Sequence, residues 1–172
     1  MHRTHSNVFV IGKSGSGKSP VSKAISAHYK IGYISGGGWV RSQFSEDASR
    51  QRLTSDMVEY TQSKLRKNPD VGLEYLMSSI EGPTVIEGLR NPRDFMHVFD
   101  PRYDHLVYLQ YSRDVVESTF DSGIEVIDSY ASWLLQNKLL QPERCRRYCF
   151  DSYDALDEII LRETEVSYES TS

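Results

Sequence analysis

A glycine- and serine-rich turn between an apolar run and a helical pattern is the feature that most constrains this fold. Residues 12–19 read Gly-Lys-Ser-Gly-Ser-Gly-Lys-Ser and fit the spacing G-x-x-x-x-G-K-[ST] at every fixed position. The four residues before the turn are Val, Phe, Val and Ile, a continuous run that favours a buried parallel strand. After the turn, Val21 and Ile25 have the spacing of one helix face. A strand, a turn and a helix in this order predict an anion site at the end of the strand.

The residue types in this turn explain how it would hold a triphosphate. Glycines let successive backbone N–H groups point into one concavity, and the helix that follows adds unpaired N–H donors with a partial positive charge. The Lys18 ammonium would reach the β- and γ-phosphates, and the Ser19 hydroxyl would bind Mg²⁺. We therefore predict binding of ATP and Mg²⁺. The predicted ATP-binding residues are Gly12, Lys13, Ser14, Gly15, Ser16, Gly17, Lys18 and Ser19.

Hydrophobic patterns along the rest of the chain predict alternating strands and helices, which is typical of an α/β protein with a parallel sheet. Pro92 is suited to the first turn of a helix. The polar tail over 164–172 is expected to fray. Further strands are predicted at 31–34, 84–86, 105–109 and 158–161, and helical segments over 38–67 and 113–150.

Length and composition limit the class of protein. With 172 residues, of which 38% are hydrophobic, the chain is long enough for one domain with a core. It has no apolar stretch near the roughly 18–20 residues of a membrane helix, and its polar first residues lack a signal-peptide core. Two cysteines make no disulfide framework. We expect a soluble, cytoplasmic protein without a membrane partner, and the sequence does not indicate its oligomeric state.

The segment after the second predicted strand resembles one found in small phosphotransferases. Residues 33–41, Tyr-Ile-Ser-Gly-Gly-Gly-Trp-Val-Arg, are similar to the aromatic-Ile-Ser-x-Gly-Asp-x-x-Arg pattern of adenylate kinase and other nucleoside monophosphate kinases. The resemblance implies that Arg41 binds the phosphate of the acceptor, and that Ser35 and Gly37 line the acceptor pocket. Glycine follows Gly37 where the family has Asp. Trp39 comes next and would stack on an acceptor base.

The segment after the third predicted strand carries an acid and two arginines. Glu87 ends that strand, and ligands bind outside the carboxyl ends of parallel strands. Its carboxylate would orient Mg²⁺ or take a proton from a hydroxyl acceptor. The run Glu-Gly-Leu-Arg from Glu87 is closer to the Asp-Gly-x-Arg of proteins similar to dephospho-coenzyme A kinase than to the Asp-Gly-x-Pro-Arg of monophosphate kinases. This resemblance implies that Arg90 and Arg93 bind an acceptor phosphate.

A lid is the least complete part of the pattern. In the resembled family, arginines after the fourth strand neutralise the charge of the transferring group, and Arg113 is the candidate here. The second arginine that the family often has a turn or two later is absent. Arg144, Arg146 and Arg147 form the next basic cluster and would serve instead, unless they belong to a solvated helix face.

Together these resemblances imply a three-layer P-loop NTPase fold, an α/β architecture with a parallel sheet of about five strands flanked by helices. We expect a single domain over residues 1–172, with a core over about 7–114 and a helical C-terminal part over about 113–163. A helical lid and acceptor region is expected in addition to the sheet. The predicted function is a kinase that moves the γ-phosphoryl group of Mg-ATP to a nucleotide-like acceptor, first of all a nucleoside monophosphate. Lys18, Glu87 and Arg113 are the predicted catalytic residues, and Ser19 and Glu87 the predicted metal-binding residues.

Two alternatives stay open. A related kinase would phosphorylate 5-hydroxymethylpyrimidine within DNA, where the three glycines and Trp39 would make room for a flipped base. Residues 1–70 contain 11 basic and 5 acidic side chains, which would suit a DNA backbone, although the net charge of −4 does not favour this reading. A non-catalytic nucleotide-binding switch would keep the turn and only hydrolyse nucleotide slowly.

Overall fold

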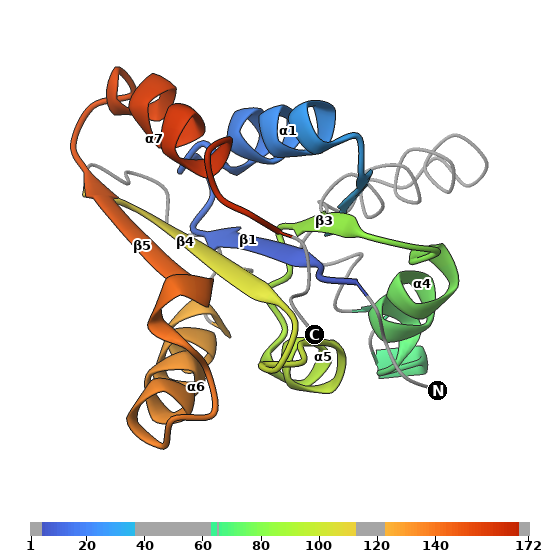
Figure 1. The fold of residues 1–172 in the computed structure, drawn as a ribbon. Coiled ribbons are helices and arrows are strands. Elements are labelled where there is room, and N and C mark those ends of the chain that lie inside the picture. The colour runs from blue at the N-terminus through green and yellow to red at the C-terminus, as the bar shows by residue number, and fades with distance from the viewer. Residues whose placement is uncertain (1–4, 37–62, 65, 113–122, 169–172) are drawn as a thin grey trace.

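The computed structural model describes residues 5–36, 63–64, 66–112 and 123–168 of the chain. Within these residues, five strands form one parallel sheet in the order β2-β3-β1-β4-β5 (Figure 1). The predicted parallel sheet of about five strands is therefore confirmed. The strands are β1 (Val8–Gly12), β2 (Gly32–Ser35), β3 (Thr84–Glu87), β4 (His105–Tyr111) and β5 (Cys145–Phe150).

Helices cover both faces of the sheet, so two helical layers and the sheet between them make the predicted three-layer architecture (Figure 1). On one face lie α1 (Lys18–Tyr29) and α7 (Ala155–Glu163), and on the other lie α4 (Val71–Ser79), α5 (Pro92–Val98) and α6 (Ile124–Gln136). A short 3-10 helix, η2 (Pro142–Arg144), precedes β5. In the parts of the chain that the structure describes, every helix is too short or too polar to cross a bilayer.

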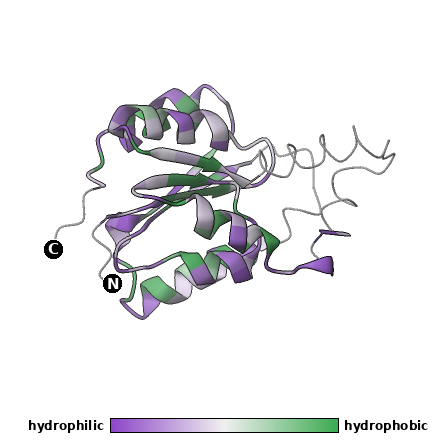
Figure 2. Ribbon diagram, turned by 90° about the vertical axis from the view of Figure 1, so that its right-hand side faces the viewer, coloured by the Kyte–Doolittle hydropathy of each residue, from purple (hydrophilic) through white to green (hydrophobic). Residues whose placement is uncertain are grey.

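β1 is the central strand and is buried on both of its faces. Val8 and Val10 pack in the core beneath α1 and α7, whereas Phe9 and Ile11 pack in the core beneath α4, α5 and α6. Figure 2 shows hydrophobic residues gathered in the central strands, with hydrophobic and hydrophilic residues mixed on the outer helices. This double burial explains why the run before the turn is apolar without interruption.

The fifth strand is not where the sequence predicted it. Residues 158–161 belong to helix α7, in which Ile159 is buried against the core and Leu161 is exposed. The apolar run there is only three residues long, so its length could not distinguish a strand from a helix. The true β5 lies within the predicted helical segment 113–150, and among the described residues of that segment, 123–150, α6 is the α-helix that follows the prediction. β5 lies at the edge of the sheet, where strands tolerate charged residues. Its two arginines interrupt the apolar run by which a strand is recognised.

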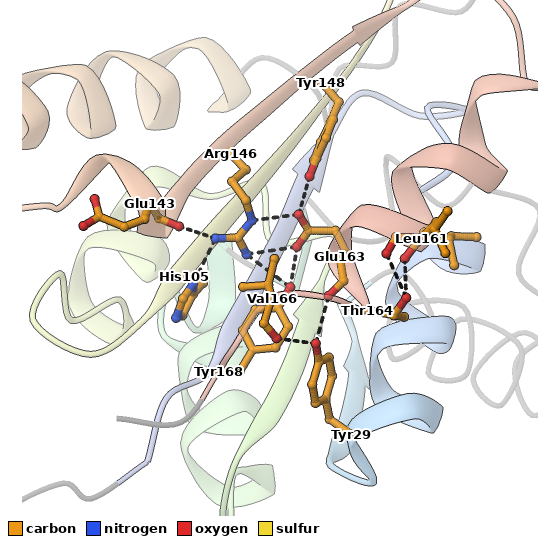
Figure 3. A network of polar contacts seen from close by, with 11 residues as sticks. Tyr29, His105, Glu143, Arg146, Tyr148, Leu161, Glu163, Thr164, Val166 and Tyr168 are labelled. Atoms are coloured by element: carbon orange, nitrogen blue, oxygen red, sulfur yellow. Dashed lines mark hydrogen bonds and ion pairs between the residues drawn. The ribbon is translucent and has the colours of Figure 1, made fainter. Parts of the chain in front are cut away.

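A buried polar network explains why β5 can carry one of these arginines (Figure 3). Glu163 at the end of α7 is fully buried and accepts hydrogen bonds from Arg146 Nε at 2.7 Å and Nη2 at 2.9 Å. It also accepts hydrogen bonds from the hydroxyls of Tyr148 and Tyr168. Although burial alone raises the pKa of Glu163, the hydrogen bonds and charge of Arg146 hold it below its ordinary value. Burial lowers the pKa of His105 to about 3, so its neutral ring accepts a hydrogen bond from Arg146.

The expectation of a frayed tail beginning at residue 164 is wrong as far as Tyr168. This side chain is only 7% exposed, and its ring makes edge-on contacts with the rings of Tyr29 on α1 and His105 on β4. A single aromatic residue in a polar segment therefore anchors the end of the chain, because the core offers both an apolar surface and a buried carboxylate for its hydroxyl.

We predict that Glu163→Gln lowers the free energy of unfolding at pH 7 by about 3–5 kcal/mol, because it leaves the Arg146 charge without a buried partner. The pKa of Glu163 in the folded protein lies below its ordinary value of 4.5. Its contribution is therefore complete above that pH and is lost as the pH falls through the folded pKa. Urea unfolding of both proteins from pH 7 to pH 3 would show a difference that shrinks as the pH falls.

Glu158→Gln is the matched control, because Glu158 pairs with Arg162 on the same helix at 2.7 Å, with both side chains exposed. Its effect is expected to stay within about 1 kcal/mol. Equal losses of unfolding free energy for Glu163→Gln and Glu158→Gln would contradict the prediction that the buried network stabilises the fold more than the exposed pair does.

Candidate active site

The glycine-rich turn runs from the end of β1 to the start of α1. Gly15 and Gly17 have φ angles of 82° and 88°, a left-handed backbone conformation that residues other than glycine rarely adopt. Gly17 is also the N-cap of α1 and has no side chain to cap it, so the first backbone N–H groups of the helix face the turn. These features suit a cradle for phosphate oxygens at a helix N-terminus.

Lys18, the first residue of α1, lies against this cradle. Its side chain is only 6% exposed, and its Nζ donates a hydrogen bond to the backbone oxygen of Lys13 at 2.8 Å. The bond holds the ammonium group next to the turn, since Lys13 lies near the start of the turn and Lys18 near its end. The structure thus places Lys18 where the sequence predicted a phosphate ligand.

Glu87 is brought to the turn by the register of the sheet. It lies opposite Val10 in the parallel pairing of β3 with β1, so its side chain stands at the carboxyl edge beside the turn. Its Oε1 accepts a hydrogen bond from the Ser19 hydroxyl at 3.2 Å. Hydroxyl and carboxylate oxygens are the protein ligands that Mg²⁺ takes, so Ser19 and Glu87 fit a magnesium ion bound next to the phosphates.

The two predicted acceptor arginines after β3 lie in different surroundings. Arg90 Nη2 donates to Ser14 Oγ at 3.4 Å, so the guanidinium group lies near the glycine-rich turn. Arg93 Nη2 instead pairs with Asp70 Oδ1 at 2.7 Å on the surface, where its side chain is 61% exposed. The structure therefore brings Arg90, but not Arg93, to the glycine-rich turn.

A cavity of about 490 Å³ lies over the turn, a size within the usual range for small-molecule sites. The predicted residues Ser35, Glu87 and Arg90 share this cavity with residues of the turn and with two residues that follow β5. Its lining residues are Ser14, Gly15, Gly17, Lys18, Ser19, Pro20, Ser35, Glu87, Gly88, Arg90, Tyr153 and Leu156.

Tyr153, Leu156 and Tyr33 contact the turn or Glu87, and the sequence pattern does not indicate them. The Tyr153 hydroxyl donates to Gly15 O at 2.6 Å, and its ring stacks on Tyr111 with 4.6 Å between centroids. A Cβ at Gly17 would lie 2.8 Å from Leu156, so α7 closes directly on the turn. Tyr33 on β2 donates a hydrogen bond to Glu87 Oε2. The contacts of Tyr153 and Leu156 depend on β5 and α7, which the sequence pattern does not predict.

Gly37, Trp39, Arg41 and Arg113 lie outside the described residues, so their predicted roles stay predictions.

The alternative lid formed by three arginines near β5 is wrong. Arg144 donates to the backbone oxygen of Arg102, Arg146 pairs with Glu163, and Arg147 pairs with Asp128 at 2.8 Å. Their guanidinium groups are bound to the sheet and helices away from the turn, and none of the three lines the cavity. The alternative of a solvated helix face is also excluded, because Arg144 ends the short 3-10 helix η2, and Arg146 and Arg147 lie in the strand β5.

No protein-family model matches the chain, and no curated protein matches its sequence. Among solved structures, a protein of Chloroflexus aurantiacus J-10-fl with a provisional kinase assignment aligns with a TM-score of 0.56 at 10% identity, over 96% of this chain and 97% of that chain. A shikimate kinase of Acinetobacter baumannii in complex with shikimate gives 0.49 at 11% identity, over 93% and 91%. A gluconokinase of Sinorhizobium meliloti 1021 gives 0.46 at 19% identity, over 95% and 91%. The likeness to the Chloroflexus protein shows a shared three-layer α/β fold, as predicted.

We predict that Lys18→Met weakens the binding of a non-hydrolysable ATP analogue by roughly 10- to 100-fold, because a charge-assisted hydrogen bond contributes about 1.5–3 kcal/mol. Isothermal titration calorimetry would measure the change. Lys23→Met is the control, because Lys23 lies on the exposed side of the same helix. Equal affinity of Lys18→Met and the parent protein would contradict this assignment of the phosphate site.

Proposed function

We propose that the protein is a kinase that transfers the γ-phosphoryl group of Mg-ATP to an acceptor bound beside Glu87. The observation that carries the proposal is the 3.2 Å hydrogen bond between Ser19 and Glu87, made at the edge of a cavity that also holds Lys18 and the glycine-rich turn. Phosphoryl transfer requires a cradle for the phosphates, a positive group and oxygen ligands for Mg²⁺. The turn, Lys18 and the pair of Ser19 and Glu87 would supply them. The provisional kinase assignment of the Chloroflexus protein agrees with this proposal.

The chain's own residues would act mainly by position and charge. The backbone N–H groups of the turn bind the triphosphate, and the Lys18 ammonium neutralises charge on its terminal phosphates. Arg90, held near Ser14, adds a second positive group on the same side of the cavity. When bound at Ser19 and Glu87, Mg²⁺ supplies charge neutralisation on the phosphate oxygens.

The donor base is proposed to lie against Tyr153. This ring is 52% exposed, lines the cavity and is held from behind by Tyr111, so it offers a free aromatic face beside the triphosphate cradle. Stacking on such a face contributes roughly 1–3 kcal/mol per base.

A nucleotide-like acceptor remains the proposal, with a nucleoside monophosphate as its first form. A second form, the hydroxyl of a 5-hydroxymethylpyrimidine in DNA, is favoured by one observation: Arg93 is bound to Asp70 and not turned to the cavity. With Arg93 paired elsewhere, the cavity has one fewer positive side chain to bind a phosphate on the acceptor. Glu87 would still accept the proton of a hydroxyl acceptor.

We predict that wild-type protein transfers γ-labelled phosphate from ATP to at least one acceptor in a panel of nucleoside monophosphates, dephospho-coenzyme A and hydroxymethylated DNA. Glu87→Gln should lower the rate by roughly 10²- to 10⁴-fold, because it removes the candidate base and metal ligand. Glu81→Gln, at an exposed position before β3, is the control. Release of inorganic phosphate alone, with every acceptor unlabelled, would instead favour a nucleotide-binding switch.

We also predict that Tyr153→Leu weakens the binding of an ATP analogue by roughly tenfold, because the aromatic face for the base is lost. Binding of inorganic tripolyphosphate, which has no base, should be unchanged in the same calorimetric titration. Tyr153→Phe is the comparison, because it loses only the hydrogen bond to Gly15. If the leucine variant weakens both ligands equally, Tyr153 supports the turn and does not bind the base.

A further inference from the structure

Tyr33 and Glu87 meet because of the register between β2 and β3. Ser35 lies opposite Glu87 and Tyr33 lies opposite Val85, so all four side chains stand on the face covered by α1. Tyr33 is two residues, or roughly 7 Å, behind Glu87 along the strand direction. Its long side chain covers this distance, and its hydroxyl donates to Glu87 Oε2.

The carboxylate of Glu87 is thus held by one hydroxyl donor on each oxygen. Ser19 on α1 binds Oε1 and Tyr33 on β2 binds Oε2, while the residue itself is only 6% exposed. Glutamate has one more rotatable bond than the aspartate that the resembled kinases have here. It therefore needs an additional contact to keep one rotamer at the wall of a cavity.

Tyr33 is well suited to be that contact. Its ring packs against the core cluster that contains Val10 and Val85, so its hydroxyl has a defined position.

We propose that Tyr33 is a positioning residue that orients the Glu87 carboxylate toward the Mg²⁺ of Mg-ATP, an inference that rests on the proposed function. Tyr33 binds Oε2, while Oε1 lies 3.2 Å from the hydroxyl of Ser19, the other candidate ligand. The two hard ligands are thereby held together before an ion arrives. Partners of this kind behind a metal ligand usually account for roughly 10- to 100-fold in metal affinity or activity.

The molecule contains an internal control for this proposal. Tyr148 on β5 also donates its hydroxyl to a buried carboxylate, Glu163 Oε2, and its ring packs in the same core cluster. That pair belongs to the network of Figure 3 and does not line the cavity. Tyr33→Phe and Tyr148→Phe therefore remove the same kind of bond, but only the first bond touches the candidate metal site.

The test is a calorimetric titration of adenylyl imidodiphosphate into each variant, with Mg²⁺ and with EDTA. For Tyr33→Phe we expect the gain in affinity that Mg²⁺ provides to fall by roughly 10- to 100-fold, while binding in EDTA is unchanged. The kcat of phosphoryl transfer should fall by a similar factor, while the KM of the acceptor stays the same. Tyr148→Phe should lower the melting temperature but change neither quantity, and thermal unfolding shows whether both variants are folded.

The inference is overturned if Tyr33→Phe keeps the full effect of Mg²⁺, or if Tyr148→Phe loses as much of it. It is also overturned if Tyr33→Phe causes a further loss of Mg²⁺ affinity in a Glu87→Gln background, because a positioning residue acts only through its partner. A wild-type protein that binds Mg²⁺ and nucleotide but labels no acceptor would refute the proposed kinase reaction alone, since the Mg²⁺ titration still tests Tyr33.

Discussion

The pairing of β1 with β3 is the interaction on which the candidate site depends. It sets Val10 opposite Glu87, and the backbone N–H of Gly88 continues the pairing by donating to Val10 O at 3.1 Å. Because side chains alternate along a strand, a slip of one residue would turn Glu87 toward α5 and α6, away from Ser19. In the observed register the carboxylate accepts hydrogen bonds from Ser19 and Tyr33, and a slip would remove both donors, so the register determines where the carboxylate stands.

Much of this arrangement could be predicted from local sequence. The glycine-rich turn has a fixed spacing, and β1, β3 and β4 are short apolar runs bounded by glycine, proline or charged residues. Buried parallel strands require such runs, so the sheet and the edge that carries Glu87 followed from the pattern alone. The metal-binding pair of Ser19 and Glu87 could be proposed for the same reason, since each follows the end of a predicted central strand.

The rest depends on contacts between distant residues, which a local pattern does not contain. Arg146 makes β5 look polar, and only its partner Glu163 at the end of α7 explains how a strand can hold it. Because the sequence pattern predicts a helix at β5, it does not indicate that the chain returns to the turn at Tyr153. Tyr33 was assigned to a strand correctly, but its bond to Glu87 depends on a register that no single segment specifies.

Helix α7 joins the glycine-rich turn to the buried polar network around Glu163. In its first turn, Leu156 packs against Gly17 of the glycine-rich turn. At its last residue, Glu163 accepts hydrogen bonds from Arg146 and Tyr168. Nine helical residues form a rod of roughly 13 Å that does not bend easily. The same nine residues therefore line the cavity over the turn at one end and join the buried polar network at the other.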